Sequence, residues 1–176
     1  GEPLLSRHTW AVLEHFKQQP NPQIHLEINS NLSLPTHTLQ KLISKVNDLE
    51  GNVKSFTLYT SVDSVGEQAE YIRFGLNYSQ LLDNIHQLLS QAQWPIRLAF
   101  MITVNALSLP GLEALLQKIY ELRVMYPQHR IFFDTPLLKH PKHMAIDILP
   151  KEYDVYLTNT LKMMMSLHTT PHRFHE

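Results

Sequence analysis

Polar side chains follow four short runs of this 176-residue chain that are rich in β-branched, aromatic and aliphatic residues. They lie in the stretches 29–31, 60–64, 103–105 and 134–136, which contain Asn, Ser, Thr and Asp. Amide, hydroxyl and carboxylate groups can together donate and accept several hydrogen bonds to one polar ligand. The same residue types cap helices and form turns, so the alternative interpretation is that they only shape the loops.

Histidine and methionine are the other residue types here that can bind a metal. His140 and His143 form a His-x-x-His pair, and His172 and His175 form a second one, a spacing that metal ligands can have. The first pair follows a proline-containing loop sequence and the second lies in the C-terminal tail. We therefore expect no metal site, and we expect the run Met163–Met165 to pack in a core or interface. No residue is assigned as catalytic.

To bind one ligand, the polar stretches must be brought together by strands and helices. The sequence predicts four strands, followed by these polar stretches, at 24–28, 55–62, 96–104 and 130–134. It predicts helices near residues 7–19, 35–46, 78–91, 110–122 and 151–167. This alternation indicates an α/β fold with a parallel sheet of about four strands and crossover helices. An open doubly wound sheet and part of a β/α barrel both fit, and both place ligands at the carboxyl ends of the strands.

Composition excludes several classes of protein and site. Hydrophobic residues make up 43% of the chain, enough for a core. The formal net charge is −1, so we expect no nucleic-acid partner. No apolar run reaches the roughly 18 residues that span a bilayer, and we expect a cytoplasmic protein. With no Cys, the chain cannot form disulfides, thiolate zinc sites, Cys nucleophiles or an iron–sulfur cluster on its own thiolates.

Six short motifs, taken in order along the chain, carry a family resemblance. They are Gly1-Glu2-Pro3, Asn29-Ser30-Asn31, the stretch 61–67 (SVDSVGE), the stretch 70–75 (EYIRFG), the stretch 102–105 (ITVN) and the stretch 136–150. The ordered set resembles the radical S-adenosylmethionine (radical SAM) superfamily, in particular members with a C-terminal twitch extension. In that family three Cys thiolates hold a four-iron four-sulfur cluster, and reductive cleavage of S-adenosylmethionine (SAM) gives a 5′-deoxyadenosyl radical that abstracts hydrogen from a substrate.

The resemblance implies a fold and a domain division. Residues 1–150 would correspond to strands three to six of a partial (β/α)6 barrel. Residues 151–176 would be a C-terminal helix and tail that lead toward a missing extension. The chain has no Cys and starts inside the Gly-Glu-Pro motif, so we expect an N-terminally truncated piece without the Cys-x-x-x-Cys-x-x-Cys loop.

The resemblance also implies roles for nine residues. Gly1, Glu2 and Pro3 would lie near the methionine amino group, Arg73 near the methionine carboxylate, and Ser61 and Asp63 near the ribose or the methionine end of SAM; Asn29, Asn31 and Asn105 would bind the nucleoside. The alternatives are a disordered N-terminus, a salt bridge of Arg73 with Glu67, Glu70 or Asp63, and polar turns or helix caps for the others.

The functional expectation is therefore the incomplete core of a radical SAM enzyme whose parent acts on an unknown peptide, protein or metabolite. SAM and the cluster would be cofactors of the parent, and we expect neither bound to this chain, which would be inactive. A cluster-free binding or scaffold domain is the alternative, and an unrelated α/β domain is a third. We also expect a homodimer, formed through the exposed strand 24–28, the inner sheet face or the apolar helix end Met163–Leu167.

Overall fold

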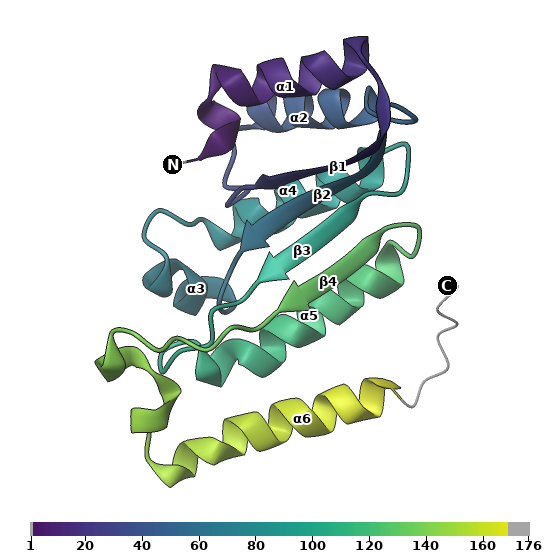
Figure 1. Ribbon diagram of the computed structural model, residues 1–176. Coiled ribbons are helices and arrows are strands. Elements are labelled where there is room, and N and C mark those ends of the chain that lie inside the picture. The colour runs from purple at the N-terminus through teal and green to yellow at the C-terminus, as the bar shows by residue number, and fades with distance from the viewer. Residues whose placement is uncertain (1, 169–176) are drawn as a thin grey trace.

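The computed structural model describes residues 2–168, so Gly1 and the tail 169–176 lie outside the described residues. Within them, one sheet is flanked by α-helices and short 3-10 helices (Figure 1). The strands are β1 (Asn21–Asn29), β2 (Val53–Ser61), β3 (Arg97–Met101) and β4 (Arg130–Asp134). The α-helices are α1 (Arg7–Gln18), α2 (Thr36–Asn47), α3 (Gly66–Ile72), α4 (Tyr78–Gln91), α5 (Leu112–Met125) and α6 (Asp154–His168). The 3-10 helices are η1 (Pro3–Leu5), η2 (Leu109–Gly111), η3 (Lys142–Met144), η4 (Ile146–Ile148) and η5 (Lys151–Tyr153).

The strands lie side by side in the order of the sequence, β1-β2-β3-β4, and all pairs are parallel. This confirms the α/β fold with a four-stranded parallel sheet and flanking helices. A doubly wound sheet reverses its strand order at a switch point, and no such reversal occurs among these four strands. Because all the strands run in one direction, their carboxyl ends meet at one edge of the sheet.

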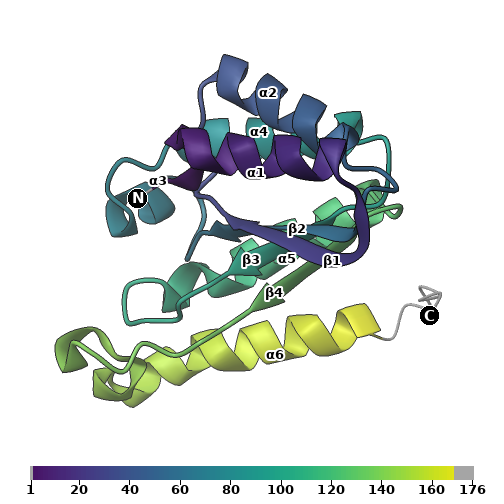
Figure 2. The same ribbon diagram turned by 45° about the horizontal axis from the view of Figure 1, so that its top comes forward.

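One face of the sheet packs against the crossover helices. Helices α2, α4 and α5 lie behind the strands in Figure 1, and the rotated view of Figure 2 shows α1 beside α2 on that side. Apolar positions of α4 recur at helical spacing, and Leu81, Ile85 and Leu88 are almost fully buried against strand residues such as Phe56 and Leu58. Replacing one of these leucines by Ala would cost about 2–5 kcal/mol. This layer fixes the strands and thus the positions of the loops at their ends.

The other face of the sheet carries the alternate residues of each strand, and both polar and apolar side chains lie on it. The register aligns Glu27, Thr57, Arg97 and Arg130 in one row across all four strands. In Figure 1 none of the helices among residues 2–168 crosses in front of this face. The middle of β3 is covered on both faces, because the consecutive residues Leu98, Ala99 and Phe100 are all buried, whereas Arg97 and Met101 at its two ends are partly exposed. Strand β3 covers residues 97–101 and is shorter than the predicted strand at 96–104, because the chain leaves the strand conformation after Met101.

The last helix extends the helical layer beyond β4. Helix α6 packs against α5, and Met163 and Met164 contact the hydrophobic core, whereas Met165 is 70% exposed. Among residues 2–168, no helix combines the length and the apolar character that crossing a membrane requires.

Candidate functional site

A cavity of about 810 Å³ lies between α1 and β1 and extends over the carboxyl end of β1. Side chains of α1 and β1, among them Val12, Leu13 and Leu26, give it an apolar wall. Six of the residues that the resemblance implied line this one cavity: Glu2, Pro3, Asn29, Asn31, Ser61 and Arg73. They come from four separate segments, so only the fold brings them together.

Glu2 connects the start of the chain to the loop after β1. Its Oε1 accepts a hydrogen bond from the backbone N–H of Leu4 at 3.1 Å, and its Oε2 accepts one from the N–H of Asn31 at 3.1 Å. A carboxylate that accepts such bonds at the start of a helix also offsets the unpaired N–H groups there. These two hydrogen bonds fix the chain at Glu2, in contrast to the alternative of a disordered N-terminus.

The loop 29–34 is held in one conformation next to the cavity. Leu32 has a φ of 53°, a left-handed conformation that is strained for a leucine, and its side chain is buried. Ser30 Oγ accepts from the N–H of Leu32 at 3.1 Å. Asn84, buried in α4, donates to the carbonyls of Leu32 at 2.7 Å and Leu34 at 3.0 Å. These bonds fix the backbone that carries the Asn29 and Asn31 amides.

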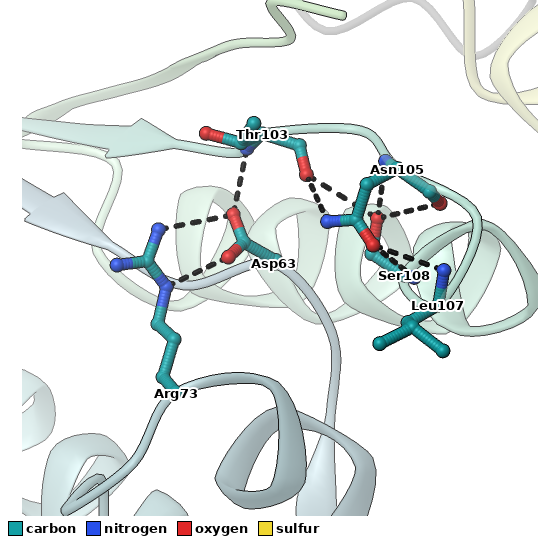
Figure 3. Close-up of polar contacts among 6 residues, drawn as sticks. All are labelled: Asp63, Arg73, Thr103, Asn105, Leu107 and Ser108. Atoms are coloured by element: carbon teal, nitrogen blue, oxygen red, sulfur yellow. Dashed lines mark hydrogen bonds and ion pairs between the residues drawn. The ribbon is translucent and has the colours of Figure 1, made fainter. Parts of the chain in front are cut away.

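Asp63 and Arg73 form a two-bond ion pair just beyond β2 (Figure 3). Arg73 donates from Nε to Oδ2 at 2.8 Å and from Nη2 to Oδ1 at 3.1 Å. Oδ1 also accepts from the N–H of Thr103 at 2.7 Å, and the Asp63 side chain is only 5% exposed. Of the three carboxylates considered as partners for Arg73, Asp63 is the one that forms the ion pair. It positions Arg73 and does not itself line the cavity. The Arg73 side chain is 32% exposed, and its Nη1 takes no part in the pair.

Asn105 forms a buried turn instead of a cavity wall (Figure 3). Its Nδ2 donates to the carbonyl of Thr103 at 2.9 Å, and its Oδ1 accepts from the N–H groups of Leu107 at 2.9 Å and Ser108 at 3.1 Å. This is the turn geometry that was the alternative interpretation of an Asn at a strand end. Asn105 supports the site through Thr103, which bonds to Asp63.

The sequence reasoning missed two features near the site. Glu27 lines the cavity beside Asn29, and the alternation of side chains along β1 was the signal that could have shown it. The predicted helix near residues 110–122 gave Gly111 no particular role, but a Cβ there would lie 2.0 Å from Ser64 Oγ. The absence of a side chain at Gly111 therefore allows the start of α5 to lie close to Ser64, which follows Asp63.

The described residues 2–168 contain no group of three or more His, Asp and Glu side chains that could hold a metal ion. His172 and His175 lie outside the described residues. The charged groups that line the cavity are the carboxylates of Glu2 and Glu27 and the guanidinium of Arg73. Searches of protein-family models, curated proteins and solved structures gave no match to this chain.

Proposed function

We propose that the cavity between α1 and β1 binds SAM. Arg73 binds the methionine carboxylate, Glu2 accepts from the amino group, and Asn29, Asn31 and Ser61 bind the nucleoside. The observation that carries this proposal is that six residues implied by the ordered motifs line one cavity at the carboxyl edge of the sheet. The sequence alone led us to expect no cofactor on this chain, and the shared cavity is the reason to propose SAM binding now.

The size and charge of the cavity support a ligand of this kind. Small-molecule sites commonly enclose about 300–1,000 Å³, and this cavity has about 810 Å³. SAM carries a sulfonium, an ammonium and a carboxylate. Two carboxylates on the cavity wall, Glu2 and Glu27, suit the two cationic groups, and Arg73 suits the anionic group through a charge-assisted hydrogen bond.

We also propose that the chain is the incomplete core of a radical SAM enzyme, with its sheet as part of a (β/α)6 barrel. The sequential strand order supports this proposal, because neighbouring strands of a β/α barrel follow the same order. The iron–sulfur cluster of that family requires thiolate ligands, and this chain has no Cys. The residues present do not fit the cluster, so this chain is assigned SAM binding and no part in SAM cleavage.

The second candidate is a cluster-free binding or scaffold domain. The absence of Cys favours it, together with the use of Asp63 and Asn105 in internal hydrogen bonds. Both candidates allow a ligand in the cavity, but only the first predicts that the ligand's α-carboxylate strengthens binding. Binding measurements can therefore separate them.

The test is isothermal titration with SAM and with decarboxylated SAM, which lacks the carboxylate. Wild-type chain should bind SAM at least tenfold more tightly than the decarboxylated compound. In Arg73→Lys this preference should shrink severalfold, because an ammonium cannot replace the planar guanidinium that holds both Asp63 and the ligand. Arg7→Lys, on the exposed side of α1, is the matched control and should keep the full preference. Absence of SAM binding, or an equal preference in both variants, would refute the proposal.

A further inference from the structure

Two arginines are neighbours on the face of the sheet that lies opposite the crossover helices. Arg97 begins β3 and Arg130 begins β4, and the two are register partners. Thr57 of β2 is the register partner of Arg97 on its other side. Because paired residues of parallel strands point to the same face, the two guanidinium groups and the Thr57 hydroxyl share one row.

Both guanidinium groups lean toward the same aromatic ring. The guanidinium carbon of Arg97 lies 5.4 Å from the centroid of the Phe132 ring, and that of Arg130 lies 5.8 Å from it. Phe132 is two residues beyond Arg130 and is the register partner of Ala99. Ala99 is only 1% exposed, so the side chains around it cover β3 here, and the two cations lie against the same ring.

Carboxylates do not neutralise this pair within residues 2–168, where neither Arg97 nor Arg130 forms an ion pair. Two acidic residues lie on this face, Glu27 and Asp134. Glu27 accepts from the Tyr59 hydroxyl at 3.4 Å, and Asp134 lies four residues further along β4 and accepts from the N–H of Thr135.

Two buried polar atoms of the row lack a hydrogen-bond partner among the described residues. They are Nε of Arg97 and Oγ1 of Thr57, and Thr57 is completely buried. A buried donor without a partner costs about 1–3 kcal/mol, and more when the group is charged. An oxyanion placed between the guanidinium groups would relieve both this cost and the repulsion between two like charges.

We propose that Arg97, Arg130 and Thr57 form an anion-binding site for a phosphate or carboxylate group of a small ligand. The two arginines supply the charge and the paired N–H donors, and the Thr57 hydroxyl supplies a neutral donor. Because Arg97 Nε and Thr57 Oγ1 are buried in the free chain, binding rotates the Arg97 side chain. This site does not depend on SAM binding in the cavity.

Nuclear magnetic resonance titration tests the site directly. Inorganic phosphate is one probe and succinate the other, which separates phosphate from carboxylate ligands. At constant ionic strength, either probe should shift the Arg97 Nε–Hε signal and the amide signals of residues 97 and 130 in a saturable way. Arg97→Gln and Arg130→Gln should each weaken binding at least tenfold, and Thr57→Val about threefold.

Arg7→Gln is the matched control, since it removes an exposed arginine on α1, and binding should remain unchanged. Far-ultraviolet circular dichroism should show that all variants keep the wild-type fold. Shifts that spread over all surface arginines, or phosphate and succinate affinities that survive both arginine substitutions, would overturn the proposal. SAM titration of the wild type and of the same variants keeps the two proposals apart. If the wild type binds phosphate or succinate but not SAM, only the cavity proposal is refuted.

Discussion

Asp63 accepts three hydrogen bonds with its two oxygen atoms, and its side chain is only 5% exposed, so its burial and its partners decide what the residue can do. Its carboxylate joins three segments: the end of β2, the loop after α3 that carries Arg73, and Thr103 after β3. A ligand would have to displace one of these partners to reach it. Asp63 is thus a positioning residue, and Arg73 is the residue that faces the cavity.

Asp63→Asn should lower the free energy of unfolding by about 2–3 kcal/mol, because it weakens a nearly buried ion pair and leaves the guanidinium without a full partner. Urea denaturation measures this change. Asp134→Asn, an exposed carboxylate at the end of the neighbouring sheet edge, is the control and should change stability by no more than about 0.5 kcal/mol. Equal effects of the two substitutions would contradict the role assigned to Asp63.

Gly111 makes a second prediction at the residue scale. Gly111→Ala should cost about 1–3 kcal/mol, since its Cβ would lie 2.0 Å from Ser64 Oγ and 2.5 Å from Gln68 Oε1. Ser64→Ala removes the closer atom, so the double variant should be more stable than the sum of the two single effects predicts. Thermal unfolding of the four proteins measures this coupling, and simple additivity would show that the close approach is not the cause.

At the scale of elements, helix α4 holds the loop after β1 through the side chains of Asn84 and Gln80. Asn84→Ala would leave the carbonyl of Leu32 without this donor, whereas the carbonyl of Leu34 keeps a bond from Gln80 Nε2 at 3.2 Å, and the cost should be about 2 kcal/mol. Because Leu32 is strained, amide hydrogen exchange should also rise in the loop 29–34 more than elsewhere. Asp83→Ala, the exposed neighbour on the same helix, should change neither quantity. Unchanged exchange in Asn84→Ala would mean that the loop does not need this anchor.

Tyr78, the first residue of α4, should make the stability of the protein depend on pH in the alkaline range. Burial raises the pKa of Tyr78, and the nearby carboxylate of Glu121 raises it further. Above a pH of about 10 the unfolded chain releases this proton while the folded chain retains it, so stability falls as the pH rises. Tyr78→Phe should reduce this fall, which urea denaturation at pH 8 to 11 measures.

Near pH 7 the same variant should be as stable as the wild type or more stable by up to about 1 kcal/mol, since the buried Tyr78 hydroxyl has no partner among the described residues. Tyr71→Phe serves as control, because Tyr71 is 80% exposed and should leave the pH profile unchanged. A profile of Tyr78→Phe that overlays the wild type would rule out a contribution from this tyrosine.

Local patterns explain why some elements were predicted well. Both ends of α4 were predicted correctly, because apolar spacing is regular and the Asn77 side chain caps the first turn. The third strand ends at Met101 rather than residue 104, since an apolar run does not reveal that the N–H of Thr103 bonds to Asp63. Helix α3 was missed because it is short and buries only Ala69.

The candidate site was predictable as a set of segments but not as a set of contacts. Strand ends had to meet at one edge, so Asn29, Asn31 and Ser61 could be grouped from the sequence. The choice of Asp63 over Glu67 or Glu70 as the partner of Arg73 depends on how α3 returns the chain to β2. The arginine pair on the face opposite the crossover helices depends on strand register, which no local pattern fixes.

At the scale of the whole molecule, one side of β1 has no partner strand among the described residues. Within residues 2–168, β1 pairs only with β2, and the cavity lies along its other side beneath α1. The N–H of Ser30 bonds to Tyr59 in β2, so by alternation the backbone groups of His25 and Glu27 point to the open edge. The inner face of the sheet carries Glu27, Arg97 and Arg130 beside Tyr59, Ala99 and Phe132, so it is not a uniformly apolar patch. The open edge is thus the better-supported contact for a homodimer, because unpaired strand edges readily pair.

We predict that the chain forms a two-fold dimer through the β1 edge at micromolar concentration. Sedimentation equilibrium measures the association of the wild type and of two substitutions at one position. His25→Pro removes an outward N–H without removing a bond to β2, and should raise the dimer dissociation constant at least tenfold. His25→Ala keeps that N–H and loses only the bond to Ser55, so its dissociation constant should stay near that of the wild type. A monomeric wild type would refute the dimer, and equal weakening by both substitutions would move the contact from the backbone edge to the side chain of His25.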